Sequence, residues 1–330
     1  MIEAEGLTKR YGSYLGIEEV SFKIEAGEAV GLLGPNGAGK TTTLRILTCA
    51  MSATSGRASV AGYDLFKESM QARRHIGYLP ETPPLYPEMT VAAYLRFAAS
   101  IKGVEPRRIA GRIDDAVELC GLEEMRKRVV GHLSKGYRQR VGIAQALIHE
   151  PKAVVLDEPT SGLDPAQIVE IRGLVQRLGH QDRAVLLTTH ILAEAQASCG
   201  RLLVINRGRI AADIRLNAAG EAVSIQTEKN APPLLSEGSV VVAARPFDEA
   251  MEARLRQIPG AVSVRRASKE SALEIQEEEP AWLVEAEPGT DIRGACAATV
   301  VEAGGELLKL APARPSLERI FLNLTQQEAA

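Results

Sequence analysis

The sequence predicts an α/β core built on a parallel sheet, followed by a smaller C-terminal α+β module. Short apolar runs typical of buried parallel strands recur along the first two thirds of the chain, and helical patterns lie between several of them. A glycine-rich loop lies directly between the first of these runs and a helix. After about Leu216 the pattern changes to other short strands and helices, and 330 residues are enough for two domains.

The elements of the core follow in order. The first 28 residues alternate apolar and polar positions, which predicts an antiparallel β subdomain. Residues 29–33, 153–157, 184–188 and 202–205 are the apolar runs that predict buried parallel strands. Asp164 followed by Pro165 marks a helix start. The helix that follows has apolar residues at helical spacing, namely Ile168, Ile171, Val175 and Leu178.

The segment between Pro80 and His149 has a different character. Apart from a proline-rich opening it shows a helical pattern throughout, clearest over residues 114–122 and 141–148. We therefore expect a helical insertion at about 82–150 within an α/β domain of about 1–215.

Residues 216–330 are expected to form an accessory domain. The pattern predicts strands at 240–243, 262–265, 282–286 and 307–310, and helices at 248–257, 292–302 and 317–324. This order resembles a small split βαβ, ferredoxin-like module. Residues 230–233, Asn-Ala-Pro-Pro, predict a loop before it.

Composition limits the class of protein. A formal net charge of -3 gives no basic footprint, so no nucleic-acid partner is expected. No apolar stretch reaches the roughly 18 residues that span a bilayer, and the acidic N-terminus has no signal-peptide pattern. We expect a cytoplasmic protein that meets a membrane only through a partner. The four scattered cysteines have no metal-ligand spacing and predict neither disulfides nor structural zinc.

Residues 34–41 match G-x-x-x-x-G-K-[ST], a loop that cradles phosphates. Its glycines let several backbone N–H groups converge, and the next helix adds the positive end of its dipole. The full spacing between a strand and a helix disfavours a glycine-rich loop that binds nothing. We expect Lys40 to reach the β- and γ-phosphates and Thr41 to ligate Mg²⁺. The expected nucleotide-binding residues are Gly34, Pro35, Asn36, Gly37, Ala38, Gly39, Lys40, Thr41 and Thr42.

Two adjacent carboxylates, Asp157 and Glu158, end the apolar run at 153–157. Asp157 at the strand tip is placed to hold Mg²⁺, directly or through water. Glu158 points elsewhere and is a candidate to polarise the attacking water. Alone, such a pair would favour a solvated turn, but beside a phosphate loop the catalytic interpretation is favoured.

Residues 133–139, Leu-Ser-Lys-Gly-Tyr-Arg-Gln, head a predicted helix at about 135–148. They resemble the signature motif of ATP-binding-cassette (ABC) ATPases, usually written L-S-G-G-Q. The resemblance continues in the D-loop at 161–164, in His190 after a strand (the switch histidine) and in Tyr11 (the adenine-stacking aromatic). Together these motifs cover about residues 1–215.

The resemblance implies a head-to-tail dimer that sandwiches two ATP molecules, each between the phosphate loop of one subunit and the signature motif of the other. Ser134 would donate to a γ-phosphate, Gly136 would permit close backbone approach, and Asp164 would belong to the same site. His190 would contact the γ-phosphate, although a lone histidine after a strand is more often structural. Tyr11 would stack on adenine, with ordinary hydrophobic packing as the alternative.

Three positions depart from the family pattern. Lys135 replaces the first glycine of the signature and either tightens the closed dimer through its charge or points to solvent. Tyr137 replaces the signature glutamine. Glu81 stands where the Q-loop glutamine usually contacts Mg²⁺ and signals to the membrane partner. Because a carboxylate still ligates Mg²⁺, Glu81 joins Thr41 and Asp157 as a candidate metal residue.

Residues 77–86 and 315–325 resemble ATPases of the ABC-2 export class, including the gliding-motility type. This implies a Mg²⁺-dependent ATPase that energises export through a separate membrane permease, docked near the helical insertion on the inner face of the cell membrane. The second ATPase subunit would be a copy or a different chain. The alternatives are a soluble ABC ATPase acting on ribosomes or nucleic acid, and a binding module that ATP switches without useful turnover.

Overall fold

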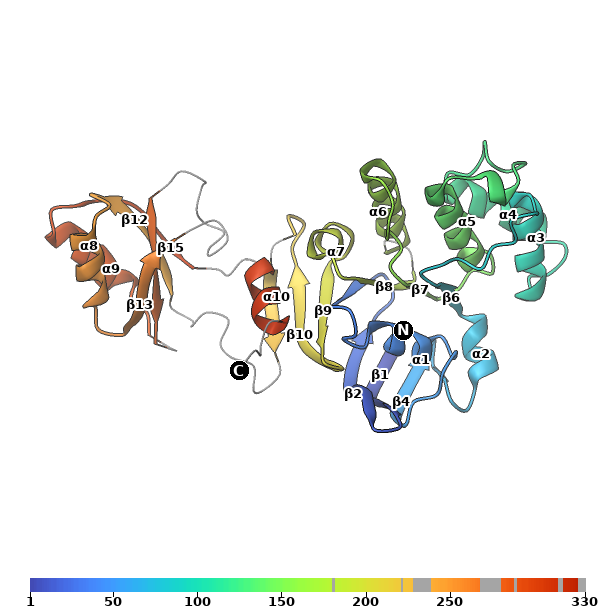
Figure 1. Cartoon of the computed structure of the whole chain (residues 1–330), viewed down its shortest axis with the longest axis horizontal. Helices are drawn as coiled ribbons and strands as arrows, with labels where there is room; N and C mark the ends of the chain where they lie inside the picture. Colours follow the sequence, from blue (N-terminus) through green and yellow to red (C-terminus); the bar gives the residue numbers. More distant parts are fainter. Residues whose placement is uncertain are drawn as a thin grey trace. The chain divides into compact units, whose positions relative to one another are not determined.

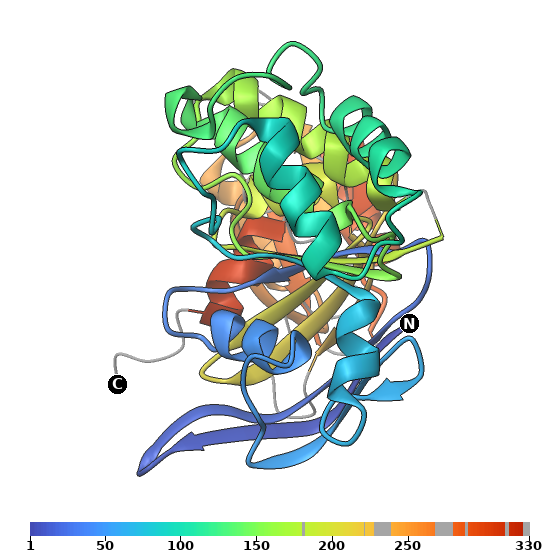
Figure 2. The same cartoon turned by 90° about the vertical axis from the view of Figure 1, so that its right-hand side faces the viewer.

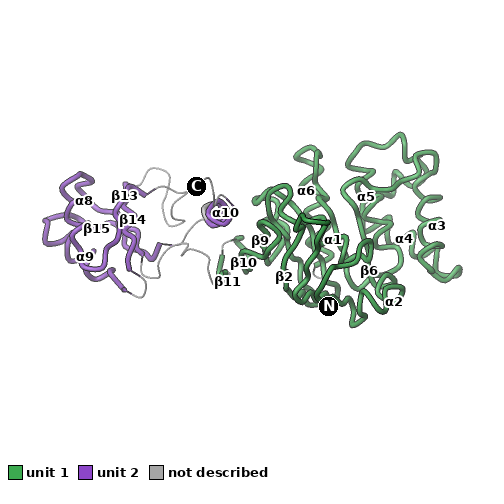
Figure 3. Tube along the Cα trace, turned by 60° about the horizontal axis from the view of Figure 1, so that its bottom comes forward, with its two compact units in different colours: residues 1–228 green, residues 229–330 purple. Residues whose placement is uncertain are grey.

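The computed structural model describes residues 1–179, 182–220, 222–227, 239–267, 280–287, 290–313 and 317–325. The chain forms two compact units, residues 1–228 and 229–330 (Figure 3). The boundary lies beyond the expected position of about 215. The reason is that β11 (Ala222–Thr227) pairs with β10 (Arg209–Leu216) and so extends the sheet of the first unit.

The first unit is organised around a seven-stranded sheet of order β11-β10-β9-β3-β8-β7-β6 (Figure 1). Its parallel part contains the four predicted strands, observed as β3 (Ala29–Leu33), β7 (Ala153–Leu156), β8 (Ala184–Thr189) and β9 (Arg201–Asn206). A further strand, β6 (Ile76–Leu79), forms the parallel edge beside β7, and the sequence pattern did not predict it. Because helices cover this sheet, β7 and β8 are buried along their whole length.

An antiparallel sheet of order β2-β1-β4-β5 precedes and follows the phosphate loop in sequence. It contains β1 (Ile2–Tyr11), β2 (Tyr14–Ile24), β4 (Ser55–Val60) and β5 (Tyr63–Asp64), which confirms the antiparallel prediction for the first 28 residues. Alternate residues of β2 enter one core together with Leu44 and Leu47 of α1 (Lys40–Leu47). This packing fixes the helix that begins at the loop.

Three helices form the insertion: α3 (Val91–Ile101), α4 (Ile109–Leu119) and α5 (Lys135–Leu147). Figure 2 shows them in teal and green on the opposite side of the first unit from the blue antiparallel strands. The prediction of helix throughout this segment is wrong. Gly103 (φ +76°) and Gly121 (φ +60°) follow α3 and α4 in the left-handed conformation, which terminates a helix. Only a short 3₁₀ turn, Val130–His132, lies in the stretch before α5.

Three further helices complete the first unit: α2 (Ser69–Arg74), α6 (Pro165–Gly179) and α7 (Leu192–Ser198). The predicted start at Asp164 is confirmed, since its carboxylate accepts from the backbone N–H of Gln167 at 3.0 Å. The predicted apolar face of α6 is buried at Ile171, Val175 and Leu178.

The second unit has the element order β12 (Val240–Arg245), α8 (Glu249–Arg256), β13 (Ala261–Arg266), β14 (Ala281–Ala286), α9 (Arg293–Glu302) and β15 (Glu306–Pro312). Its antiparallel sheet has the order β13-β14-β12-β15. Helix α10 (Leu317–Thr325) follows. The order βαββαβ is that of a split βαβ module, whose core here includes Trp282. The predicted loop at 230–233 lies outside the described residues.

Candidate nucleotide-binding site

The phosphate loop connects the carboxyl end of β3 to α1. Gly37 (φ +80°) and Gly39 (φ +109°) have the left-handed backbone that glycine adopts without strain. A Cβ at Gly39 would also lie 2.6 Å from Cγ2 of Ile17, so no larger residue fits this turn. The loop therefore turns tightly enough to point its amides into the concavity at the start of α1, as phosphate binding requires.

Lys40 is the first residue of α1, and its ammonium is held inside the loop. Nζ donates to the carbonyl of Gly34 at 2.8 Å and to that of Pro35 at 3.2 Å. It also lies 3.8 Å from Oε1 of Glu158. Burial lowers the pKa of Lys40, while the charges of Glu158 and Asp157 oppose that change. The loop thus keeps one cation at the position where phosphate charge would accumulate.

Asp157 and Glu158 follow β7 and are organised by a single hydroxyl. Oγ1 of Thr188, on the neighbouring strand β8, donates to Asp157 Oδ1 at 2.7 Å and accepts from the Glu158 backbone N–H at 3.0 Å. Asp157 is buried, and burial raises its pKa, with Thr188 opposing and the charge of Glu81 adding to the rise. Glu158 has φ +47°, an uncommon conformation for a residue with a side chain. The turn therefore directs the two carboxylates to different places.

Glu158 and His190 meet at the edge of the sheet where β7 and β8 end. Glu158 Oε2 lies 2.7 Å from His190 Nδ1. A carboxylate can only accept, so Nδ1 carries the proton of this bond. His190 is half exposed, and its Nε2 is the ring nitrogen left for another contact.

These side chains surround one pocket of about 310 Å³. Its lining contains most of the predicted site and consists of Tyr14, Gly16, Asn36, Gly37, Gly39, Lys40, Thr41, Thr42, Glu81, Glu158, Ser161 and His190. Asp157 lies buried at the adjacent strand tip, 4% exposed. Residues as far apart as Asn36, Glu81 and His190 are thus brought together, as triphosphate binding would need.

Besides Asp157, seven predicted residues do not line this pocket: Gly34, Pro35 and Ala38 belong to the phosphate loop itself, and Tyr11, Ser134, Gly136 and Asp164 belong to other segments. Ser134 caps α5, with its hydroxyl 3.4 Å from the Tyr137 backbone N–H, and it is exposed. Gly136 and Asp164 are likewise absent from the lining. Tyr11 is also outside: its hydroxyl donates to Sδ of Met51 at 3.0 Å. The single chain therefore presents the phosphate loop and the signature motif as separate surfaces.

Sequence reasoning missed two functional candidates. Tyr14 lines the pocket, and its ring centroid lies 6.5 Å from that of Tyr11, so Tyr11 lies beside the pocket although it is not part of the lining. Thr188 aligns both carboxylates, as described above. The signal for Thr188 was available, because two threonines interrupt the apolar strand immediately before His190.

The donor set fits Mg²⁺ held jointly by protein and phosphate. Among the described residues no group of three or more His, Cys, Asp or Glu side chains is placed to hold an ion by itself. Mg²⁺ commonly uses one or two carboxylates together with substrate phosphates and water. Thr41 and Glu81 in the pocket lining, with Asp157 at the strand tip, match that type of site.

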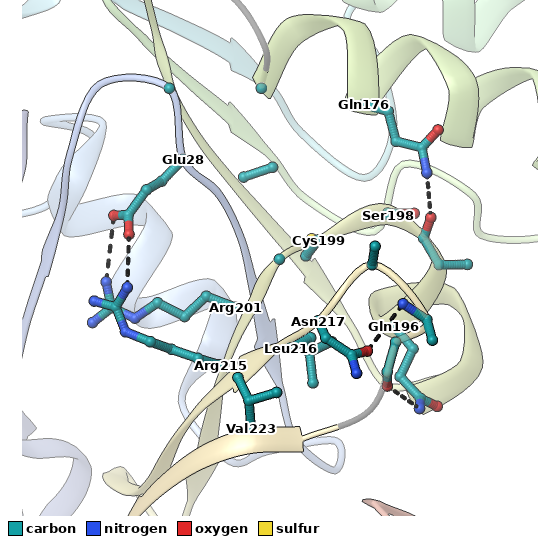
Figure 4. A pocket seen from close by; sticks show the side chains of 18 of the residues that line it. Glu28, Gln176, Gln196, Ser198, Cys199, Arg201, Arg215, Leu216, Asn217 and Val223 are labelled. Carbon is teal, nitrogen blue, oxygen red and sulfur yellow. Dashed lines mark hydrogen bonds and ion pairs between the residues drawn. The ribbon is translucent and has the colours of Figure 1, made fainter.

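A larger cavity of about 820 Å³ lies elsewhere in the first unit, bounded by α6, α7 and residues 215–220 (Figure 4). Its cations are paired: Arg201 lies 3.4 Å from Glu28 and 2.6 Å from Asp213, and Arg215 lies 4.0 Å from Glu28. No residue of the phosphate loop lines it. Size alone therefore does not identify the nucleotide site.

A parallel sheet with a glycine-rich phosphate loop, paired strand-tip carboxylates and a helical insertion that carries the signature motif defines a P-loop ATPase of the cassette type. Comparison with known proteins agrees. The family model described as "ABC transporter" matches residues 17–161. The uncharacterized ABC transporter ATP-binding protein YxlF of Bacillus subtilis is 40% identical over 210 residues, which are 64% of this chain and 69% of that protein.

Two further comparisons extend this. The linearmycin resistance ATP-binding protein LnrL of Bacillus subtilis is 30% identical over 326 residues, 98% of each chain. The dimeric structure of MJ0796, a bacterial ABC transporter cassette, has a TM-score of 0.60 and 26% identity, covering 66% of this chain and all of that one. The same cassette is also known in a post-hydrolysis state bound to ADP and Pi, at 25% identity. This chain belongs to the ABC transporter ATP-binding proteins.

Proposed function

We propose that this protein is the Mg²⁺-dependent ATPase subunit of an ABC-2 type exporter. The observation that carries the proposal is the convergence of Lys40, Glu158 and His190 on one pocket. Ser134 is exposed and Gly136 is buried, and neither of them lines this pocket. A site divided in this way is completed by a second ATPase subunit. The cassette MJ0796, similar in fold, has been described as a dimer.

Hydrolysis would follow from the positions of these side chains. Lys40 would leave the carbonyls of Gly34 and Pro35 and bind the β- and γ-phosphates. Glu158 would orient a water and accept its proton as the water oxygen bonds to the γ-phosphorus and the bond from that phosphorus to the β–γ bridging oxygen breaks. His190 would donate from Nδ1 to Glu158 and, with a second proton on Nε2, would donate from Nε2 to a γ-phosphate oxygen. The products are ADP and phosphate.

Mg²⁺ would neutralise developing phosphate charge when bound. Thr41, Asp157 and Glu81 would hold it. Glu81 carries one more negative charge than the glutamine usual at this position, so the site would favour a cation more strongly and attract phosphate less. The remaining nucleotide contacts proposed for the same chain are the loop residues 34–42 and adenine stacking by Tyr11.

The second subunit would contribute Ser134, Gly136 and Asp164. Ser134 already caps α5, so its hydroxyl lies at the positive end of that helix, where a γ-phosphate of the other subunit would be attracted. ATP would then hold the two subunits together, and hydrolysis would release them.

A separate permease is the proposed membrane partner, and the chain would be cytoplasmic and peripheral to the membrane through it. No helix in the described ranges is both long and apolar enough to cross a bilayer. Tyr86 and Phe97, on the loop before α3 and on α3 itself, are partly exposed, with ring centroids 5.4 Å apart. Such an exposed aromatic pair supports docking near the helical insertion. The relative named for linearmycin resistance supports the export direction.

The test uses the hydrolysis-blocked variant Glu158→Gln. With ATP and Mg²⁺ it should sediment as a dimer, and without nucleotide or with ADP as a monomer. A preparation that remains monomeric at saturating ATP would contradict the sandwich. For the transport role, the tagged chain should co-purify with a membrane permease. Recovery with ribosomes, and none with membranes, would instead support the soluble alternative.

A further inference from the structure

The start of the signature helix α5 and the D-loop turn, defined as residues 160–164, contact each other through two glycines and two long side chains. The ammonium end of Lys135 lies directly over Gly162: a Cβ built there would contact Lys135 Nζ and lie 3.7 Å from its Cε. Reciprocally, Gln167 of α6 covers Gly136, where a Cβ would lie 2.5 Å from Oε1 and 2.9 Å from Cγ of that glutamine. The start of α5 supplies Gly136 and Lys135, the D-loop turn supplies Gly162, and the first turn of α6 supplies Gln167.

The D-loop turn is hydrogen-bonded to the backbone of Glu158, the candidate catalytic residue that follows β7. The Ser161 backbone N–H donates to the Glu158 carbonyl at 3.1 Å, and that of Leu163 donates to the Thr160 carbonyl at 3.2 Å. The Thr160 hydroxyl donates to Glu194 on α7 at 2.5 Å. A displacement of the backbone at Glu158 would therefore move this turn, and through the contacts above it would move the start of α5.

An ion pair does not explain the position of Lys135. Its side chain is exposed, and none of the ion pairs between described residues includes Lys135. It is also the first residue of α5, where the helix dipole disfavours a cation. The absence of a Cβ at Gly162, which has φ +64°, is what makes room for it.

We propose that Lys135 and Gln167 are positioning residues that make the signature motif and the D-loop turn of one subunit move as a unit, with Lys135 and Gly162 as a matched pair. The Lys135 side chain acts by filling the space over the glycine. This inference rests on the proposed two-subunit site. It adds a path by which a movement of the Glu158 backbone in one subunit would displace the signature motif that serves the nucleotide of the other subunit.

A double-mutant cycle on the full chain tests the pair. Gly162→Ala places a methyl group where the Lys135 ammonium now lies, so this flexible side-chain end moves away and its contact with the turn is lost; we expect kcat for ATP to fall at least about fivefold while KM changes less than about twofold. The KM should hold because the phosphate loop is untouched. Lys135→Ala breaks the same contact and should lower kcat to a similar extent, and the double variant with Gly162→Ala should fall no further than either single variant. If the double variant instead loses the product of the two single losses, the pair is uncoupled and the inference is overturned.

Two further variants separate the possible causes. Gly103→Ala is the matched control for backbone cost, because Gly103 has φ +76° and a Cβ there meets nothing within 4 Å. It should leave kcat unchanged. Lys135→Met keeps the length of the side chain without its charge and should retain most of the activity. A loss in Lys135→Met as large as in Lys135→Ala would show that the charge acts on nucleotide, and would overturn the packing role.

The proposed function is judged by a different experiment. If Glu158→Gln dimerises with ATP but the cycle shows no coupling, only the Lys135–Gly162 inference fails. If Glu158→Gln never dimerises, the two-subunit site fails, whatever the cycle shows.

Discussion

The carboxylate of Glu158 lies 2.7 Å from Nδ1 of His190, although the two residues are 32 positions apart in the chain. They meet because β7 and β8 are parallel neighbours whose carboxyl ends lie at one edge of the sheet. The Thr188 hydroxyl accepts a hydrogen bond from the Glu158 backbone N–H at 3.0 Å and so holds Glu158 in this place. This pair is the structural basis of the first two predictions.

Glu158→Gln should bind ATP with near-normal affinity and lose most of its turnover. An amide keeps the size of the side chain but cannot accept the proton of the attacking water, and such a loss is typically about 10²–10⁴-fold in kcat. Steady-state phosphate release and ATP-binding titrations measure the two effects separately. Glu28→Gln is a control for removal of a carboxylate, because Glu28 does not line the nucleotide pocket. Turnover in Glu158→Gln equal to that of the unmodified chain would exclude Glu158 as the catalytic carboxylate.

His190→Ala should lower kcat by about 10²-fold, because the γ-phosphate loses a contact and Glu158 loses its orienting partner. Since the proposed partner of His190 is the γ-phosphate, which ADP lacks, the affinity for ADP should hardly change. His132→Ala, at an exposed position in the 3₁₀ turn, supplies the control. An equal loss of ADP affinity and of kcat would indicate instead that His190 has a general structural role.

Glu81→Gln should raise the Mg²⁺ concentration required for half-maximal ATPase activity, by about tenfold, because one anionic oxygen near the metal is removed. The same change should lower the pKa of Asp157, since the charge of Glu81 contributes to its rise. The measurement is an ATPase titration with Mg²⁺ at saturating ATP, with exposed Glu88→Gln as the control. Unchanged Mg²⁺ dependence and turnover would remove Glu81 from the metal site.

His149 should make the first unit less stable in mild acid. Burial, with help from the charge of Lys102, lowers the pKa of His149 from 6.5 to about 3, and its Nε2 lies 3.0 Å from the carbonyl of Ile76. Between pH 6.5 and 3 the unfolded chain binds a proton that the folded chain does not, so stability falls as the pH falls. The loss from pH 7 to pH 5 should be about 1–2 kcal/mol.

His149→Gln should flatten this decline, because glutamine does not titrate and retains an N–H donor. Urea unfolding followed by far-UV circular dichroism at pH 7 and pH 5 measures it. His132→Gln, which alters an exposed histidine, should leave the decline in place. An identical pH dependence in His149→Gln and the unmodified chain would refute this assignment.

Asp248→Ala should destabilise the second unit by about 1 kcal/mol, because the Asp248 carboxylate caps α8 by accepting from the Met251 backbone N–H at 2.9 Å. The chain has one tryptophan, Trp282, buried in the core of that unit, so its fluorescence during urea unfolding reports this unit selectively. ATPase activity should be unchanged. Glu249→Ala, which removes an exposed carboxylate of the first turn without a cap bond, should cost only a few tenths of a kcal/mol.

The sequence by itself determined the chemistry of the site. The phosphate loop, the carboxylates after β7, the histidine after β8 and the signature at the start of α5 are short local patterns, and each depends on residues a few positions apart. The apolar runs predicted the buried parallel strands equally well, because both faces of such a strand are apolar. The cap at Asp164 and the apolar face of α6 follow from the same local rules.

Only the tertiary structure decided which of these residues meet. Thr188 reaches Asp157 and Glu158 because β7 and β8 are neighbours, and Tyr14 lines the pocket because of the path of β2. Lys135 faces Gly162 because α5 packs beside the D-loop turn. The first unit continues through β11 because β11 pairs with β10. The sequence of residues 216–228 does not predict this pairing. Each of these relations is set by packing between distant segments, and local spacing carries no information about it.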